Sequence, residues 1–236
     1  MNTKANIIII EDEKNICNFI ETVLSPQGYQ VTCANTGTDG LKLIESLKPD
    51  VVLLDLGLPD MDGLELIQEV RSTSALPIIV ISARTQEKSK VAALDQGADD
   101  YLTKPFLTQE LLLRIQRILQ RCYRGELWRT AAKTLQLGQR TVYLADALVR
   151  LPDGTAQPLT ATERALLQKL AENRGHIVTY DAVCEAVWGA DYYGYENSLN
   201  VHIRHLREKL EPNPSKPQYL LTVRGIGYKL AEENAQ

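Results

Sequence analysis

Polar residues follow four short apolar segments of this 236-residue chain, each at the point where the apolar run stops. They are Glu11 and Asp12 after residues 7–10, Asp55 after residues 51–54, Ser82 after residues 78–81, and Lys104 after residues 101–102. Carboxylates without nearby His or Cys suit a hard, oxygen-preferring cation, and Mg²⁺ is the expected ion. The set therefore predicts an acidic metal site with a hydroxyl and an ammonium group beside it.

The chemistry expected of this set is phosphoryl transfer to a carboxylate. The expected metal ligands are Asp12, Asp55, the carbonyl of Gly57 and, directly or through water, Glu11. With the metal bound, Asp55 stays ionised and can accept a phosphoryl group as an aspartyl-phosphate. The metal and the Lys104 ammonium would balance the charge of the phosphoryl oxygens. Ser82 can bond a phosphoryl oxygen only after transfer, so its position should respond to phosphorylation.

The apolar segments themselves indicate how these side chains are brought together. They consist mostly of Ile, Val and Leu, which is typical of strands buried on both faces. Helix-length segments separate them, so a parallel sheet is expected, and ligands bind just beyond the carboxyl ends of such strands. Any one of these residues alone could be a helix cap or a loop residue. Helix capping, however, does not easily explain why all of these residue types lie together at the ends of the apolar segments.

The segments IIIIEDE, VVLLDLGLPDMDGLEL, PIIVISAR and GADDYLTKPF resemble the receiver domain of two-component response regulators. The resemblance covers about residues 5–122 and implies an α/β fold, a flavodoxin-like doubly wound five-stranded parallel sheet. The roles it implies are a phosphoacceptor at Asp55, acidic Mg²⁺ residues at Glu11 and Asp12, switch residues at Ser82 and Tyr101, and a phosphoryl-contacting Lys104 before a cis Pro105. It also implies a cognate sensor histidine kinase as a partner.

Length and composition favour two domains and exclude several classes of protein. We predict a receiver over residues 1–122, a linker over 123–133 and an output domain over 134–233. No apolar run is long enough to span a membrane, and residues 7–10 are too few for a secretion signal. A cytoplasmic protein without a membrane partner is expected. The four scattered cysteines suit reduced thiols, and the histidines show no zinc-ligand spacing.

Charge is distributed unevenly along the chain. Residues 1–122 contain 12 Lys+Arg and 17 Asp+Glu, a net of −5, and the remainder contains 26 − 12 = 14 and 30 − 17 = 13, a net of +1. A net of +1 is weak evidence for a nucleic-acid binder. Residues 197–229, however, include six basic residues and only two acidic ones. The basic surface is therefore expected to be local.

The second half of the chain has the pattern of a small sheet followed by three helices. Alternating segments near residues 135–137, 141–143 and 147–151 suggest an antiparallel sheet. Thr160 and Glu163 have the spacing of a capping box, which opens a helix that ends near residue 175. A second helix is expected over about residues 180–188.

A third helix, expected over about residues 196–210, carries the apolar stripe Leu199, Ile203, Leu206 and Leu210. At 100° per residue, the residues on or beside the opposite face are Asn197, Asn200, Arg204 and His205. Such side chains read base edges or hold phosphates, although a solvated surface helix is the commoner fate of charged faces. Two short strands around the turn at Arg224 then suit a hairpin inserted near a phosphate backbone or minor groove.

The segments SLNVHIRHLREKLE and TVRGIGYKL resemble the effector domain of the OmpR/PhoB class, an α+β winged helix-turn-helix, over about residues 130–232. The resemblance implies a partner of double-stranded DNA, with the third helix in the major groove. The contacts it implies are Asn197, Asn200, Arg204, His205 and Arg207 on the helix, Arg224 and Tyr228 on the wing, and Thr222 and His202 at phosphates. Many members carry Arg at the positions of His205 and near Asn197, so their operators cannot be transferred to this chain.

The family's dimer face lies around Tyr101. It would bring Lys90 to Glu110, and Asp100 to Arg114, of a partner subunit when Asp55 is phosphorylated. Each exposed ion pair contributes only about 0–1 kcal/mol, so packing of apolar residues would supply most of the association energy. The residues expected to supply it are Val91, Leu94 and Leu111. Phosphorylation would then shift the population toward a DNA-binding homodimer, for which RNA polymerase is a further possible partner.

Within the class, DLGLPDMDG and SARTQEKSKVAALDQGADDYLTKPF look most like the Kdp potassium-responsive regulators. A regulator of a potassium-transport operon is therefore one reading, and a regulator of a different stimulus is another. A phosphotransfer enzyme with a non-DNA output is the rival from another class, but the second half lacks a phosphate loop or a nucleophile–base pair. An RNA-binding output is a third reading, against which the RRM and KH motifs are missing.

Overall fold

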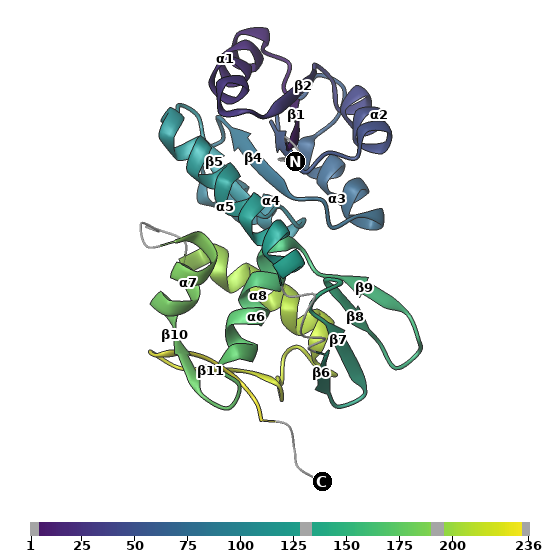
Figure 1. Ribbon diagram of the computed structural model, residues 1–236, viewed down its shortest axis with the longest axis vertical. Coiled ribbons are helices and arrows are strands. Elements are labelled where there is room, and N and C mark those ends of the chain that lie inside the picture. The colour runs from purple at the N-terminus through teal and green to yellow at the C-terminus, as the bar shows by residue number, and fades with distance from the viewer. Residues whose placement is uncertain (1–4, 128–133, 190–195, 233–236) are drawn as a thin grey trace. The chain divides into compact units, whose positions relative to one another are not determined.

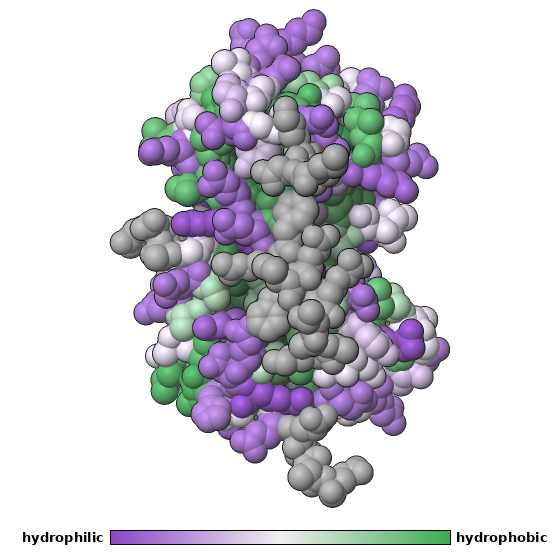
Figure 2. Space-filling model, viewed as in Figure 1, coloured by the Kyte–Doolittle hydropathy of each residue, from purple (hydrophilic) through white to green (hydrophobic). Residues whose placement is uncertain are grey.

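The computed structural model describes residues 5–127, 134–189 and 196–232. The chain forms two compact units, Met1–Leu119 and Gln120–Gln236, which are described separately below. Among the described residues, no helix is both long and apolar enough to cross a membrane. In Figure 2, hydrophilic residues cover much of the visible surface, and hydrophobic ones appear in scattered groups.

Unit 1 is built on a five-stranded parallel sheet, as the sequence predicts. The strands are β1 (Asn6–Ile10), β2 (Gln30–Ala34), β3 (Val51–Leu54), β4 (Ile78–Ser82) and β5 (Asp100–Thr103), in the order β2-β1-β3-β4-β5. Strands β3 and β4 are buried along their whole length because helices cover both faces of the sheet. The strand order reverses between β1 and β3, which is where such sheets form a ligand crevice.

The helices of unit 1 alternate with its strands (Figure 1). They are α1 (Lys14–Leu24), the 3-10 turn η1 (Ser25–Gln27), α2 (Gly37–Leu47), α3 (Gly63–Thr73), α4 (Glu87–Asp95) and α5 (Thr108–Leu127). Helices α2 and α3 begin at side-chain caps, because Thr36 accepts from the Asp39 N–H and Asp62 accepts from the Leu64 N–H. These caps fix where the loops at the sheet's carboxyl edge end.

Helix α5 differs from the sequence prediction in its length. It continues to Leu127, so the first five residues of the predicted linker are helical. The division between the two compact units falls inside this helix, between Leu119 and Gln120. Residues 128–133 lie outside the described residues, and the predicted domain limits 1–122, 123–133 and 134–233 stay predictions.

After the end of α5, the described residues of unit 2 form two antiparallel sheets and three helices. The first sheet is β6 (Thr134–Leu137), β7 (Arg140–Tyr143), β8 (Leu148–Arg150) and β9 (Ala156–Pro158), and the second, in the order β10-β12-β11, is β10 (Ile177–Thr179), β11 (Leu220–Val223) and β12 (Gly227–Leu230). The helices are α6 (Ala161–Glu172), α7 (Tyr180–Trp188) and α8 (Glu196–Leu210). Strands β9 and β10 were not predicted, since each is defined by its pairing partner and not by a local sequence pattern.

The hydrophobic core of unit 2 lies between its helices and sheets. The predicted stripe on α8 is confirmed, because Leu199, Ile203, Leu206 and Leu210 are all buried. The capping box of α6 is also confirmed: the Thr160 hydroxyl accepts from the Glu163 N–H, and the Glu163 carboxylate accepts from the Thr160 N–H. A cap of this kind contributes about 0.5–2 kcal/mol.

The predicted hairpin forms from β11 and β12, with residues 224–226 as its turn. Gly225 has φ +75°, a conformation that glycine adopts without strain. At Gly227, a Cβ atom would lie 2.0 Å from the Val178 carbonyl oxygen, so only glycine allows β12 to approach β10. The two glycines therefore fix the turn and the three-stranded pairing respectively.

Candidate functional site

The three predicted carboxylates meet at the carboxyl edge of the unit 1 sheet. One oxygen from each of Glu11, Asp12 and Asp55 lies within 4.8 Å of the others. Glu11 and Asp55 are buried, at 2% and 8% exposure, whereas Asp12 is exposed. The parallel topology thus brings the end of β1 and the end of β3 together as predicted.

Lys104 lies between two of these carboxylates. Its Nζ donates to Glu11 Oε2 at 2.6 Å and to Asp55 Oδ2 at 2.7 Å. The other carboxylate oxygen of Asp55, Oδ1, accepts from the Gly57 N–H at 3.2 Å. The peptide bond from Lys104 to Pro105 is cis, as the family resemblance implied. The ammonium group therefore offsets part of the negative charge of the pocket.

The surroundings shift the pKa values of the two buried carboxylates in opposite directions. Burial raises the pKa of Glu11, although Lys104 acts against that change. Burial also opposes ionisation of Asp55, but the hydrogen bond and charge of Lys104, with backbone N–H donors, hold its pKa below the usual value. The pKa of Lys104 is raised by its two carboxylate partners despite burial, which favours the neutral amine. Asp55 is thus the buried carboxylate that its surroundings hold in the ionised form.

The donor set fits Mg²⁺. Glu11, Asp12 and Asp55 offer three carboxylates close together, and the described residues bring no imidazole or thiolate into this group. Oxygen donors of this kind suit Mg²⁺ better than a softer metal. Gly57 follows two residues after Asp55, so its carbonyl is near enough in sequence to serve as the predicted additional ligand.

Ser82 and Tyr101 both bond to the backbone of Arg84. The Ser82 Oγ accepts from the Arg84 N–H at 3.3 Å, and the Tyr101 hydroxyl donates to the Arg84 carbonyl at 2.7 Å. Tyr101 is 3% exposed, and burial raises its pKa. The family resemblance implies that Tyr101 is a switch residue, and in the structure its side chain lies inward.

The predicted dimer face needs two corrections. Arg114 bonds both carboxylate oxygens of Asp100 in the same chain, at 2.7 and 2.8 Å, and also pairs with Glu110 at 2.7 Å. Asp100 is 4% exposed, because it lies on β5 beneath α5. The pair predicted between subunits is therefore formed within one chain, and an intersubunit Asp100–Arg114 pair would first require these bonds to break.

The second correction concerns apolar packing at this face. Leu94 and Leu111 are 1% and 0% exposed, since they belong to the core of unit 1. They cannot supply the association energy predicted for them. Val91 is partly exposed, and Lys90 lies near it on α4, so these two remain on the predicted face. Among the described side chains of α5, Leu113 is the exposed large apolar one, and the sequence analysis did not single it out.

The predicted DNA-contacting residues of α8 divide between surface and interior. Asn200 and Arg204 are exposed, and Arg204 pairs with Glu208 along the helix, at 3.5 Å. Asn197 lies on α8, but its side chain is outside the described residues. Arg224 is exposed in the hairpin turn. These positions are compatible with the predicted contacts.

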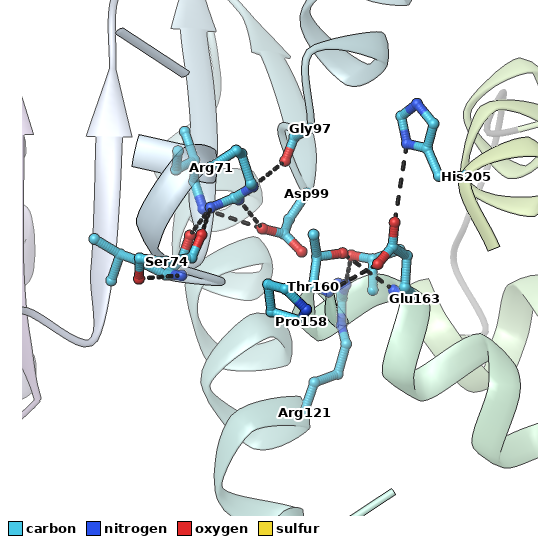
Figure 3. Close-up of polar contacts among 12 residues, drawn as sticks. Arg71, Ser74, Gly97, Asp99, Arg121, Pro158, Thr160, Glu163 and His205 are labelled. Atoms are coloured by element: carbon cyan, nitrogen blue, oxygen red, sulfur yellow. Dashed lines mark hydrogen bonds and ion pairs between the residues drawn. The ribbon is translucent and has the colours of Figure 1, made fainter. Parts of the chain in front are cut away.

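Two histidines of α8 are placed differently from the prediction. His202 is 2% exposed and packs near Trp188, with ring centroids 6.1 Å apart, so the phosphate contact predicted for it is wrong. The His205 side chain is 12% exposed and points toward Glu163 of α6, with Nδ1 4.0 Å from Oε1 (Figure 3). Burial lowers the pKa of His205. His205 thus lies mainly in the packing of α8 against α6.

Three further residues predicted to contact DNA, Arg207, Thr222 and Tyr228, form hydrogen bonds between α8 and the β11–β12 hairpin. Arg207 donates to the Leu220 carbonyl at 2.9 and 3.0 Å and to the Thr222 hydroxyl at 2.7 Å. Tyr228 is 3% exposed, and its hydroxyl donates to Asn200 Oδ1 at 3.1 Å. Burial contradicts a direct wing contact by Tyr228. Thr222 is exposed, but its hydroxyl already accepts from Arg207.

Sequence reasoning missed Glu211, which is 1% exposed. Its carboxylate accepts three backbone N–H groups at the start of β11, from Gln218 at 2.8 Å, Tyr219 at 2.9 Å and Leu220 at 2.6 Å. Together with Arg207, it ties the end of α8 to the hairpin. The available signal in the sequence was that Glu211 is an acidic residue within the mainly basic segment 197–229.

A second missed cluster lies in unit 1, around Arg71 and Asp99 (Figure 3). Asp99 is 0% exposed and bonds Arg71 Nη2 at 2.9 Å. Arg71 also donates to the carbonyls of Gly97 at 2.8 Å and Leu76 at 2.6 Å. The cluster joins α3 to the loops beside β4 and β5. Its partners are far apart in sequence, so no local pattern announces it.

Comparison with known families agrees with this geometry. Residues 7–116 match the response regulator receiver domain, and residues 154–230 match the family described as transcriptional regulatory protein, C terminal. A receiver with a DNA-binding output domain defines a two-component transcriptional response regulator.

Similarity to solved structures extends over nearly the whole chain. DrrB of Thermotoga maritima, an OmpR/PhoB homolog, is 30% identical, with 98% of this chain and 100% of that chain covered and a TM-score of 0.52. A variant of RitR is 25% identical, with 97% and 100% covered and a TM-score of 0.78. A CheY-like receiver of Methanospirillum hungatei is 29% identical over 52% of this chain and 98% of that chain, with a TM-score of 0.50. The chain belongs to the OmpR/PhoB class of response regulators.

Proposed function

We propose that Asp55 receives a phosphoryl group from a cognate sensor histidine kinase and that this modification controls sequence-specific DNA binding by unit 2. The observation that carries the proposal is the convergence of Glu11, Asp12, Asp55 and Lys104 in one pocket. This pocket lies in a chain whose other unit matches a transcriptional regulator.

The chemistry follows from the pocket's charges. An Asp55 carboxylate oxygen attacks phosphorus, the bond from phosphorus to the donor's histidine nitrogen breaks, and its electron pair stays on that nitrogen. The Lys104 ammonium already bonds Asp55 Oδ2 and would move to a phosphoryl oxygen as charge builds there. Glu11, Asp12, Asp55 and the Gly57 carbonyl would hold Mg²⁺, which supplies positive charge beside the phosphoryl oxygens.

The response would pass through Ser82. Its Oγ lies at the carboxyl end of β4 and accepts from Arg84. Bonding to a phosphoryl oxygen would draw Ser82 toward Asp55 and shift the Arg84 backbone, to which Tyr101 is anchored. The face that includes Lys90 and Glu110 would then become competent to form a homodimer. Loss of the phosphoryl group as phosphate would reset the switch, so the output is DNA binding and not turnover of a substrate.

Labelling with acetyl phosphate tests the phosphoacceptor. Asp55→Asn should lose the label, because an amide is a far poorer nucleophile than a carboxylate. Asp60→Asn is a matched control, since Asp60 follows the same strand but bonds Gly37 and Thr38 at the start of α2. Retained labelling of Asp55→Asn would overturn the proposal.

Binding to duplex DNA tests the output. A gel shift with duplex DNA and single-stranded RNA should show the duplex complex, strengthened by phosphorylation. The contacts proposed are Asn197, Asn200 and Arg204 of α8 and Arg224 of the hairpin. Unchanged duplex affinity and unchanged oligomeric state after acetyl-phosphate treatment would contradict the coupling between the two units.

The target we propose is a potassium-transport operon of the Kdp type. The support is the likeness of DLGLPDMDG and of the segment from Ser82 to Phe106 to the Kdp regulators. Footprinting of the phosphorylated protein on the upstream region of such an operon, and on its own upstream region, tests this target. RNA polymerase would be the further partner recruited there. Protection of its own region alone would identify a regulator of a different stimulus.

A further inference from the structure

Helix α5 belongs to both compact units. In unit 1 its side chains Ile115 and Ile118 are each 0% exposed. The division between the units falls after Leu119, and the helix continues without interruption to Leu127. Arg121, the second residue of unit 2, follows Ile118 by three residues, so the two side chains are neighbours on the helix. The rise along the helix from one to the other is about 4.5 Å.

Within unit 2, Arg121 is bonded to the first turn of α6. Its side chain reaches toward that turn (Figure 3), where Nη1 donates to the Thr162 hydroxyl at 2.6 Å. Arg121 and Thr162 are 8% and 0% exposed. In the opposite direction, Arg164 Nη2 donates to the carbonyls of Arg121 and Cys122, to the latter at 3.1 Å. Each helix therefore donates hydrogen bonds to the other, and loss of a buried bond from a guanidinium is strongly destabilising.

The same turn of α6 also holds α8. Glu163 is 1% exposed, and its Oε2 accepts from Lys209 Nζ of α8 at 2.5 Å. Lys209 also donates to the Pro158 carbonyl at 2.8 Å, at the end of β9. Consecutive side chains of a helix point in directions about 100° apart. One turn of α6 therefore contacts α5 through Thr162 and Arg164, and α8 through the residue between them.

The backbone of α5 links Ile118 to Arg121. In an α-helix each N–H bonds the carbonyl four residues earlier, so the turn that carries Arg121 depends on the ordered backbone of residues 117–119 in unit 1. Helix formation is cooperative, and opening of one turn spreads readily to the next. Loss of order at Ile118 would therefore also loosen the bond between Arg121 and Thr162.

We propose that the bonded end of α5 makes the stabilities of the two units depend on each other within a single chain. A ligand that stabilises unit 1 then also stabilises α6 and α8, and duplex DNA bound by unit 2 stabilises unit 1, because such coupling is reciprocal. This dependence needs no second subunit, unlike the homodimer of the proposed function. Its use as a signal rests on the proposed phosphorylation of Asp55, but the dependence itself does not.

Amide hydrogen exchange of the unphosphorylated full chain tests the inference, at a concentration where sedimentation shows a monomer. Unit 1 is perturbed in two ways, by added Mg²⁺ and by Lys104→Met. With Arg121 present, Mg²⁺ should slow exchange and Lys104→Met should speed it, in α6 and α8 as well as in unit 1. Arg121→Met keeps a long unbranched side chain but lacks the guanidinium. It should lower the protection of α6 by about tenfold and confine both responses to unit 1.

Gln120→Met is the matched control, because Gln120 is the exposed neighbour of Arg121 on the same helix, and it should respond as wild type does. Thr162→Val removes the accepting hydroxyl and should act as Arg121→Met does, and thermal melting confirms that each variant is folded. Responses of α6 and α8 in Arg121→Met that equal those in wild type would overturn the inference. A Lys104→Met effect confined to unit 1 would overturn it too. Mg²⁺ that alters exchange nowhere, with a Lys104→Met effect in both units, would overturn the proposed metal site and support the inference.

Discussion

The acidic pocket of unit 1 and the α8–hairpin surface of unit 2 were both predicted from the sequence. The structure agrees with the two predictions to different extents. In the pocket, the predicted carboxylates and the lysine lie together. On the α8–hairpin surface, five predicted contacts are turned inward or bonded within the unit: His202, His205, Arg207, Thr222 and Tyr228. Strand ends are placed by the path of the chain, whereas the outward face of a helix depends on what packs against it.

Removing the charge of Lys104 should have the largest effect on stability. Lys104→Met leaves Glu11 and Asp55 buried without their counter-charge, so the free energy of unfolding should fall by about 3–5 kcal/mol. Urea denaturation in EDTA measures this fall, and added Mg²⁺ should restore more stability to the variant than to wild type. No response of either protein to Mg²⁺ would contradict a metal site at these carboxylates.

Glu211 provides the corresponding test in unit 2. Glu211→Ala leaves three backbone donors at the start of β11 without their acceptor, and the free energy of unfolding should fall by about 2–3 kcal/mol. Duplex affinity should fall as well, because the hairpin loses its tie to α8. Glu211→Gln is the control and should retain most of both. Wild-type stability in the alanine variant would contradict the anchoring role.

Two arginines of α8 sharpen the comparison within one helix. Arg204→Ala should lower duplex affinity and reduce the salt dependence of binding, with little change in stability, because Arg204 is exposed. Arg207→Ala should lower the free energy of unfolding by about 1–2 kcal/mol, because it bonds Leu220 and Thr222. Salt-titrated binding and thermal melting of both variants measure these effects. A lower melting temperature for Arg204→Ala, with weaker duplex binding and unchanged melting for Arg207→Ala, would contradict these two roles.

The smallest expected effect is a pH dependence from His205. Burial lowers its pKa below 6.5, so the neutral ring is favoured in the folded state, although Glu163 and Glu208 act against this and Arg204 and Lys209 add to it. The contribution of the neutral His205 ring to the free energy of unfolding is fully present above pH 6.5. It is lost as the pH falls through the lower pKa that His205 has in the folded state. Melting temperatures of wild type and His205→Gln between pH 7.5 and 5 (about the range in which histidine titrates) should converge on acidification. Parallel curves would contradict a buried neutral His205.

Local pattern accounts for much of the fold. The apolar runs at β1, β3 and β4 gave the parallel sheet, and the capping box at Thr160 gave the start of α6, because both signals depend on neighbours in sequence. The three-residue strands β9 and β10 escaped prediction, since pairing partners and not local pattern define them. The extension of α5 to Leu127 escaped for a related reason: helix continuation there has no apolar stripe to mark it.

The sequence by itself determined the pocket, because a parallel β-α-β chain must deliver Glu11, Asp55 and Lys104 to the same edge of the sheet. Only the tertiary structure decided which polar residues of α8 face solvent. Helical spacing gives the direction of each side chain but not what lies in that direction, and α6, Trp188 and the hairpin fill directions that a projection leaves open.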